Sequence, residues 1–143
     1  MMFNDIQTFL AEAGEAGCYA LCLINVAEEF TGNSVNIVEA LKSGIDKGCI
    51  SYNWNDKNDN DNFYVNNPAT FLYYLTGKHW TVEHVSADYV KKNEKQFLIE
   101  RWERVKTGTT IGHFQRENFE PITDSLTVKY GTIKSKRLCT VTN

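Results

Sequence analysis

The residues of this sequence that could carry out covalent chemistry are a cysteine, a histidine and an aspartate, in that order along the chain. Cys18 follows Gly17 and begins an apolar run that predicts a buried helix. At a helix N-terminus, unpaired backbone N–H groups and the helix dipole stabilise a thiolate and lower the pKa of the thiol. Cys18 is therefore the cysteine that we expect to act as a nucleophile.

The other three cysteines have the surroundings of small core residues. Cys22 lies one helical turn after Cys18 in an apolar segment, which raises the pKa of a thiol. Cys49 and Cys139 adjoin apolar residues in predicted strands. The four cysteines form neither paired C-x-x-C clusters nor a dense disulfide pattern, so we expect four free thiols.

A thiol nucleophile needs a base, and the segment 109–124 offers one with a partner. If a hairpin bends at Asn118–Phe119, His113 lies opposite Asp124, with Cβ atoms about 4.5–5.5 Å apart. A carboxylate beside an imidazole fixes its tautomer and stabilises the imidazolium. A bulge, or Pro121, would shift the pairing by one residue and turn Asp124 to the other face, so this pairing depends on the register.

Each of these residues, taken alone, also has a structural explanation. A cysteine at the start of a helix is more often a packing residue than a nucleophile, and a single strand histidine usually has a structural role. We expect a catalytic role because three features occur together in one chain: Gly17–Cys18 early in the sequence, His113 on a late strand and Asp124 on the segment after it.

The elements that must position these residues fall into two halves. In the first half, apolar residues recur at helical spacing. The pattern predicts a helix over 6–13, a largely buried helix over 18–30 and a surface helix that Ser34 caps and that stops before Gly48. A polar loop rich in Asn and Asp covers 53–62, and Asn67–Pro68 begin a short helix that ends at Gly77.

After Gly77 the apolar period changes from helical spacing to alternation, which predicts strands. Strands are expected from Trp80 onward, over 97–105 (a segment that also fits a helix) and over 109–115. A bend at 116–119 then leads to two more strands, 120–131 and 132–141, which would complete a meander. We therefore expect an α+β fold: one domain over 1–143, helical to about 77 and a β-sheet from 78 onward.

Composition limits the partners. The chain has 143 residues, and 15 Lys and Arg against 18 Asp and Glu give a net charge of −3. It contains no basic run of the kind that contacts a phosphate backbone, so nucleic acid is not an expected partner. No apolar stretch reaches the roughly 18–20 residues needed to cross a bilayer, and the first residues do not resemble a signal peptide, so no membrane association and a cytoplasmic location are expected.

Metal and cofactor sites are weakly indicated. The 53–62 loop has alternating Asp and Asn residues but lacks the glycine and the final glutamate of an EF-hand. Zinc bound by Cys18, Cys22, His79 and His84 is disfavoured because the two histidines have opposite parity on a strand. No glycine-rich phosphate-binding motif occurs. We expect no cofactor and no metal.

The order Cys18, His113, Asp124 resembles that of the papain-like cysteine peptidases, in particular the small bacterial proteins similar to double-glycine leader peptidases. More narrowly, four segments resemble an uncharacterised family of short proteins carried by phages, prophages and spirochaete plasmids: GCYALCLINVAEEF, NNPATFLYYLTG, GHFQ and DSLTVKYGTIKSKR. The resemblance implies a papain-like fold whose central helix begins with Cys18, with Cys18 as nucleophile, His113 as general base and Asp124 as the residue that orients it.

The sequence departs from the family pattern at two positions, and both departures weaken the case for an enzyme. A glutamine about six residues before the cysteine usually donates a hydrogen bond to the oxyanion, and here that position is Glu12. An ionised carboxylate cannot donate, and loss of one donor costs about 10²–10³ in rate. Gln7 is the only glutamine nearby. Tyr19 also stands where such peptidases often have glycine, which would narrow the cleft.

Two functions follow as hypotheses. The first is a cysteine peptidase or other thiol-dependent amide hydrolase that acts on a peptide or protein with a Cys-His-Asp triad. The second is a catalytically inactive papain-like domain, an accessory protein of a phage or other mobile element that binds a host protein. The sequence names neither a substrate nor an oligomeric state.

Overall fold

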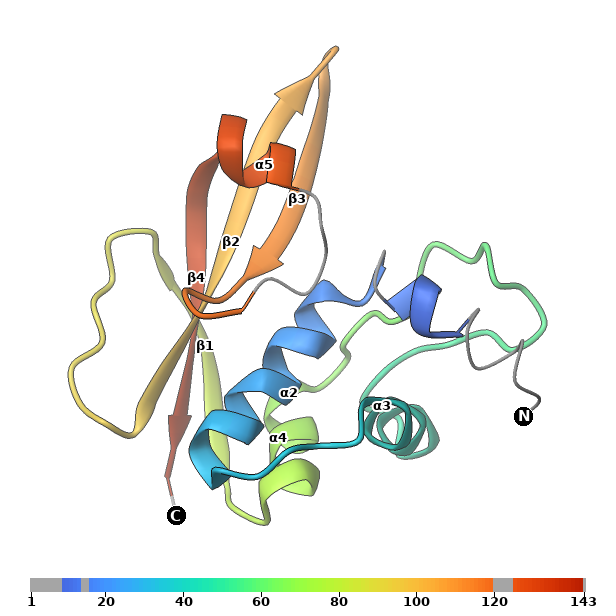
Figure 1. The fold of residues 1–143 in the computed structure, drawn as a ribbon, viewed down its shortest axis with the longest axis vertical. Coiled ribbons are helices and arrows are strands. Elements are labelled where there is room, and N and C mark those ends of the chain that lie inside the picture. The colour runs from blue at the N-terminus through green and yellow to red at the C-terminus, as the bar shows by residue number, and fades with distance from the viewer. Residues whose placement is uncertain (1–8, 14–15, 120–124, 143) are drawn as a thin grey trace.

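The computed structural model describes residues 9–13, 16–119 and 125–142, and at 125–126 the backbone alone. Helical residues 9–13 precede three longer helices, α2 (Cys18–Thr31), α3 (Ile37–Asp46) and α4 (Pro68–Thr76). The second half contains β1 (Trp80–Ser86), β2 (Gln96–Lys106), β3 (Thr109–Gln115), the short helix α5 (Ser125–Tyr130) and β4 (Thr132–Val141). The expected α+β class is confirmed, with the helices first and most of the strands after them (Figure 1).

Local sequence signals set the ends of the helices. Asn67 accepts a hydrogen bond from the Thr70 N–H and Pro68 occupies the first turn of α4, while Gly32 and Gly77 end α2 and α4 with left-handed φ angles of 74°. One expectation was wrong: Asn36, not Ser34, caps α3, because its side chain accepts from the Glu39 N–H. The expected helices over 18–30 and 68–76 agree with α2 and α4.

The polar loop 53–62 is built from repeated Asx turns. The side chains of Asn53, Asp56 and Asp59 each accept a hydrogen bond from the backbone N–H two residues later. This is the local bonding that makes Asn and Asp favourable in turns. Phe63 follows the loop with a left-handed φ of 65°, and its ring is buried.

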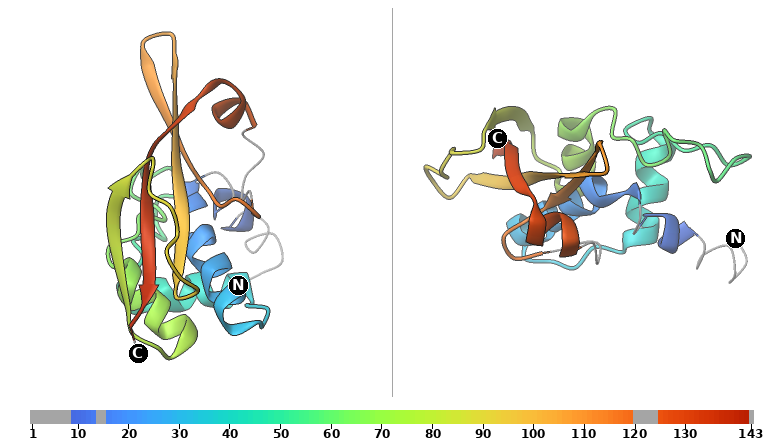
Figure 2. Two further views of the ribbon diagram at one scale, coloured as in Figure 1. Left: turned by 90° about the vertical axis from the view of Figure 1, so that its left-hand side faces the viewer. Right: turned by 90° about the horizontal axis from the view of Figure 1, so that it is seen from above.

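The sheet is antiparallel and its strand order is β1-β4-β2-β3, so the last strand in sequence lies between the first two. β4 pairs with both β1 and β2, and a bulge interrupts the pairing of β4 with β2 between Arg101 and Trp102. The β2–β3 hairpin extends beyond the helices, as Figure 2 shows, and α5 lies next to it. The expected strands over 97–105, 109–115 and 132–141 are confirmed as parts of β2, β3 and β4.

The expected meander over 109–141 is wrong. Residues Ser125–Tyr130 form α5 rather than a strand, and the strand that pairs with β3 is β2. A six-residue segment of alternating apolar residues is too short for its periodicity to separate helix from strand. β4 takes β1 and β2 as its two partners, and 125–130 packs as a helix against β2 and β3 instead of joining the sheet. The remainder of the predicted strand, 120–124, lies outside the described residues.

The core lies between α2, α4 and the sheet. From α2 it takes a continuous run of buried residues broken only by Asn25, and from the sheet Trp80, Phe97, Ile99 and Cys139. Gly44 in α3 is required by packing, since a Cβ atom there would lie 2.8 Å from Ile50 and 2.9 Å from Phe71. The buried residues of α2 and of the sheet belong to one core, which holds the helix that begins with Cys18 against the sheet.

Within the described ranges, no helix combines the length and the apolar character that a bilayer-spanning segment requires.

Candidate active site

Cys18 is the first residue of α2, as the sequence predicts. Gly17 precedes the helix and donates a 2.8 Å backbone hydrogen bond to the Ala13 carbonyl. A Cβ atom on Gly17 would lie 2.7 Å from that same carbonyl oxygen, so only glycine fits this close approach. The glycine therefore fixes how the chain enters the helix and where the Cys18 sulfur is presented.

Cys18 lines a cavity of about 420 Å³ between the start of α2, the segment after the polar loop and the sheet. The wall opposite the helix comes from strands β2, β3 and β4. Besides Cys18, the lining includes Tyr19, Tyr64, Arg101, Gly112, Phe114 and Arg137. Cys18 is half-buried, whereas Cys22, Cys49 and Cys139 are buried, so Cys18 is the only one of the four free thiols that is not buried.

Burial is the largest influence on the Cys18 thiol and raises its pKa above the ordinary value of 9.0. The backbone of Phe114, the positive charge of Arg101 and the backbone of Tyr19 lower the pKa, but they do not outweigh burial. The expectation that the helix start would leave Cys18 with a lowered pKa is therefore not met. The resting thiol is protonated at neutral pH, and attack on a carbonyl requires a base.

The other three thiols behave as predicted for core residues. Burial raises the pKa of Cys139 to about 12 and also raises the pKa of Cys22. The pKa of Cys49 is raised by burial as well. All three are closed to reagents in the folded protein.

An aromatic and cationic group stands next to Cys18. The Phe114 ring stacks on Tyr19 at 4.5 Å between centroids. The guanidinium groups of Arg101 and Arg137 lie 4.8 Å and 5.4 Å from the centre of the same Phe114 ring. Such cation–π contacts hold two positive charges at one wall of the cavity. Tyr19, where the family pattern often has glycine, is thus part of the wall.

His113 lies on β3 between Gly112 and Phe114, both of which line the cavity, but it is not itself a lining residue. It pairs with Trp102 of β2 and is only 2% exposed. Because side chains alternate along a strand, the His113 imidazole and the Phe114 ring extend from opposite faces of β3. The structure brings Cys18 next to the His113 segment and leaves the imidazole outside the lining. Asp124 lies outside the described residues.

Of the two oxyanion candidates, Gln7 lies outside the described residues and Glu12 does not serve as a donor. The Glu12 carboxylate accepts a 2.7 Å hydrogen bond from the Tyr52 hydroxyl. Burial and this carboxylate together raise the pKa of Tyr52 to about 12. Glu12 is therefore held as an acceptor against a cluster of rings formed by Phe9, Tyr52 and Phe63.

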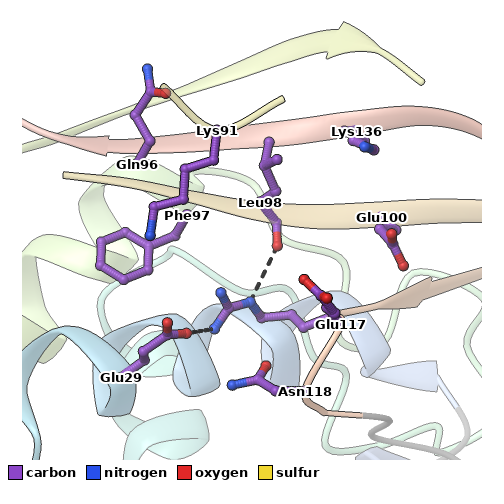
Figure 3. A pocket seen from close by; sticks show the side chains of 10 residues that line it. Glu29, Lys91, Gln96, Phe97, Leu98, Glu100, Glu117, Asn118 and Lys136 are labelled. Carbon is purple, nitrogen blue, oxygen red and sulfur yellow. Dashed lines mark hydrogen bonds and ion pairs between the residues drawn. The ribbon is translucent and has the colours of Figure 1, made fainter. Parts of the chain in front are cut away.

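A second cavity of about 400 Å³ lies further along α2, where β3 has ended, and is shown in Figure 3. Arg116 is its buried centre. The Arg116 side chain donates to the Leu98 carbonyl at 3.2 Å and to Asn25 at 2.9 Å, and it forms an ion pair with Glu29. β3 pairs with β2 only from Glu100 onward, so Leu98 pairs with Leu138 of β4 but has no partner on β3, and its carbonyl accepts from Arg116.

Sequence reasoning missed Arg101, Arg137 and Phe114. One local signal was present: Arg101 continues the strand face that carries Phe97 and Ile99, so a charged residue follows two apolar ones on the core side. Arg137 similarly lies two residues before Cys139. Their meeting depends on β4 lying beside β2, a pairing between distant segments that no local pattern reveals.

Of the aromatic residues in and after the polar loop, Phe63 and Phe71 are buried, while Trp54, Tyr64, Tyr73 and Tyr74 are exposed. Within the described part of the chain, no group of three or more His, Cys, Asp or Glu side chains is placed to hold a metal ion.

Comparison of the chain with protein-family models, with curated proteins and with solved structures gives no match. The relationship to papain-like peptidases thus remains a resemblance in the order of Cys18, His113 and Asp124 along the chain. The function of the site is therefore inferred from its own geometry.

Proposed function

We propose that the protein is a thiol-dependent amide hydrolase of the cysteine peptidase type, with Cys18 as the nucleophile, His113 as the base and Asp124 as the residue that orients His113. The single observation that supports this function most strongly is the placement of Cys18. Its half-buried thiol heads a buried helix and opens into a cavity, while the other three thiols are closed off.

In the proposed reaction, the Cys18 sulfur attacks the carbonyl carbon of an amide as His113 removes the thiol proton. Because the imidazole extends from the face of β3 opposite to Phe114, this step requires a rearrangement of β3 that brings the imidazole to the sulfur. The C–S bond forms, the C–N bond then breaks, and the proton passes to the departing amine. Water hydrolyses the thioester, which releases a carboxylic acid and restores the thiol. The backbone N–H at Cys18 is the proposed donor to the oxyanion, and Glu12 is not one because it accepts from Tyr52.

Alkylation of each thiol by iodoacetamide at pH 6–7, followed by peptide mass spectrometry, tests this proposal. Cys18 is expected to react much faster than Cys22, Cys49 or Cys139, and His113→Ala is expected to remove most of that advantage. Trp102→Phe, which alters the cross-strand neighbour of His113, is the matched control and should retain the advantage. Equal labelling of all four thiols would refute the proposal.

A second candidate function, a non-catalytic binding domain of a mobile element that holds a host protein, has its own supporting observation. The cavity lining contains no imidazole, and burial keeps the Cys18 thiol protonated. On this account, Cys18→Ala leaves partner binding intact. A Cys18→Ala variant that folds normally but loses the biological effect would argue for chemistry instead.

A further inference from the structure

The wall of the Cys18 cavity carries more positive charge than its surroundings neutralise. Arg101 and Arg137 both line the cavity and both lie on the Phe114 ring. Among the described residues, the only carboxylate paired with either is that of Glu103, 3.6 Å from the Arg101 Nε atom. The whole chain has a net charge of −3, so this positive site stands apart from the overall charge of the protein.

The donors of these two arginines are also largely unused. Arg137 donates from Nη1 to the Ser135 hydroxyl at 2.9 Å and to the Lys136 carbonyl at 3.5 Å. Within the described ranges, the Arg137 Nη2 group and both Nη groups of Arg101 donate no hydrogen bond. A guanidinium presents its N–H groups as a fork that fits the two oxygens of a carboxylate.

Burial and the neighbouring charge of Arg101 both work against the charged form of Arg137. Burial lowers the pKa of Arg137 most, the interaction with Tyr19 raises it, and the charge of Arg101 lowers it. Two like charges held together at a half-buried wall are relieved by an anion that binds both of them. The cavity therefore favours a ligand with a negative group over a neutral ligand of the same size.

We propose that Arg101 and Arg137 form a carboxylate-binding subsite next to Cys18, so that the substrate is an amide or peptide bearing a carboxylate close to the bond attacked. That the ligand is a substrate rests on the proposed hydrolase function, whereas the binding of a carboxylate by Arg101 and Arg137 does not require turnover. An acidic side chain and a C-terminal carboxylate are the two sources of such a group.

Comparison of two alkylating reagents tests the subsite directly. Iodoacetate carries a carboxylate, and iodoacetamide is its neutral counterpart of nearly the same shape. The ratio of the iodoacetate rate to the iodoacetamide rate at Cys18 is measured against the same ratio for free cysteine. We expect a ratio at least about tenfold higher at Cys18, with saturation by iodoacetate, because one charge-assisted contact is worth about a factor of ten or more.

The variants define which charges are responsible. Arg101→Gln and Arg137→Gln should each lower the ratio by about tenfold, while Glu103→Gln should raise it because it removes the carboxylate that pairs with Arg101. Lys106→Gln removes an exposed positive charge from the end of the same strand as Arg101 and should change nothing. A ratio equal to that of free cysteine, or one that responds to Lys106→Gln as strongly as to Arg137→Gln, would overturn the proposal.

Protection experiments identify the source of the carboxylate. N-acetyl-glycine carries only a terminal carboxylate, and N-acetyl-aspartate amide carries only a side-chain carboxylate. Either compound should slow the alkylation of Cys18 by iodoacetamide in the wild type but not in Arg137→Gln, and the more effective one names the source. Protection by neither, or protection that survives Arg137→Gln, contradicts the subsite.

These outcomes are separate from the hydrolase proposal. If His113→Ala leaves iodoacetamide labelling unchanged while the iodoacetate preference persists, the hydrolase proposal fails and the carboxylate subsite stands. If the preference is absent while His113 controls labelling, the subsite fails and the hydrolase proposal stands.

Discussion

The two cavities along α2 use the same type of side chain in opposite ways. At the second cavity, Arg116 is buried, paired with Glu29 and bonded to Asn25 and to the Leu98 carbonyl. At the Cys18 cavity, Arg101 pairs with one carboxylate at 3.6 Å, Arg137 pairs with none among the described residues, and both arginines are half-buried. The first arginine has used its donors within the protein, and the other two retain theirs for a ligand.

This difference separates a structural arginine from an arginine available for binding. Both regions include a cation over a Phe ring, Arg116 at 5.9 Å from Phe97 and Arg101 at 4.8 Å from Phe114, so that contact does not distinguish them. The two regions differ in the number of acceptors within the protein to which each arginine donates. Arg116 should therefore matter for stability and Arg137 for recognition.

The largest expected effect is on stability at the second cavity. Arg116→Ala removes an ion pair and two further hydrogen bonds from a buried site and should lower the free energy of unfolding by about 3 kcal/mol. Arg137→Ala should lower it by less than about 1 kcal/mol, since Arg137 is only half-buried and forms no ion pair among the described residues. Urea unfolding of the two variants provides the measurement. Equal destabilisation would remove the distinction between the two regions.

A pH effect on stability should follow from the buried thiols that lie near Arg116. Burial holds the pKa of Cys139 at about 12 in the folded protein, above the ordinary value of 9.0. Between these values the folded state binds more protons than the unfolded state, so stability is full below pH 9 and falls as the pH rises towards 12. The slope for one thiol is at most about 1.4 kcal/mol per pH unit.

Urea unfolding of the wild type and of Cys139→Ala between pH 8 and pH 10.5 checks this effect. The variant should lose stability less steeply above pH 9. Parallel curves would mean that burial does not control the ionisation of Cys139.

Displacing Arg101 without removing its charge should weaken carboxylate binding at the Cys18 cavity and leave stability nearly unchanged. A Cβ atom on Gly112 would overlap the guanidinium of Arg101, which is the flexible end of its side chain. Gly112→Ala should therefore displace Arg101, lower the iodoacetate preference of Cys18 severalfold and leave stability within about 0.5 kcal/mol. An unchanged preference in a folded Gly112→Ala protein would show that the position of Arg101 is irrelevant.

The smallest expected effect concerns the ionisation of Cys18. Arg101 lowers the pKa of this thiol through its charge, so Arg101→Gln should raise the pKa. At any pH below that pKa the thiolate fraction, and with it the rate of iodoacetamide labelling, should fall by a few-fold. A pH profile of labelling shifted to higher pH supports this, whereas a profile shifted to lower pH contradicts it.

Much of the fold could be predicted from local signals. The Asn67–Pro68 start and the Gly77 end define α4, and the apolar run after Gly17 defines α2. Alternation after Gly77 predicts β1, β2 and β3 correctly. The failures are non-local: Ser125–Tyr130 forms a helix, and β4 lies between β1 and β2, because pairing between distant strands is decided by the whole chain.

The candidate site shows the same division. The position of Cys18 at a helix start follows from its own sequence, and so does the burial of Cys22, Cys49 and Cys139. The rise in the pKa of Cys18 does not, because it depends on strands that cover the helix end. The pairing of His113 with Asp124 stays a prediction, since Asp124 lies outside the described residues.

The most direct test of the central claim is acyl transfer to Cys18 from a carboxylate-bearing ester. The protein is mixed with mono-4-nitrophenyl succinate or with the neutral 4-nitrophenyl butyrate, and nitrophenolate release and peptide masses are followed. We expect a faster burst with the succinate ester and an acyl group on the Cys18 peptide, both lost in Cys18→Ala. An equal burst in Cys18→Ala, or acylation spread over other residues, would contradict it.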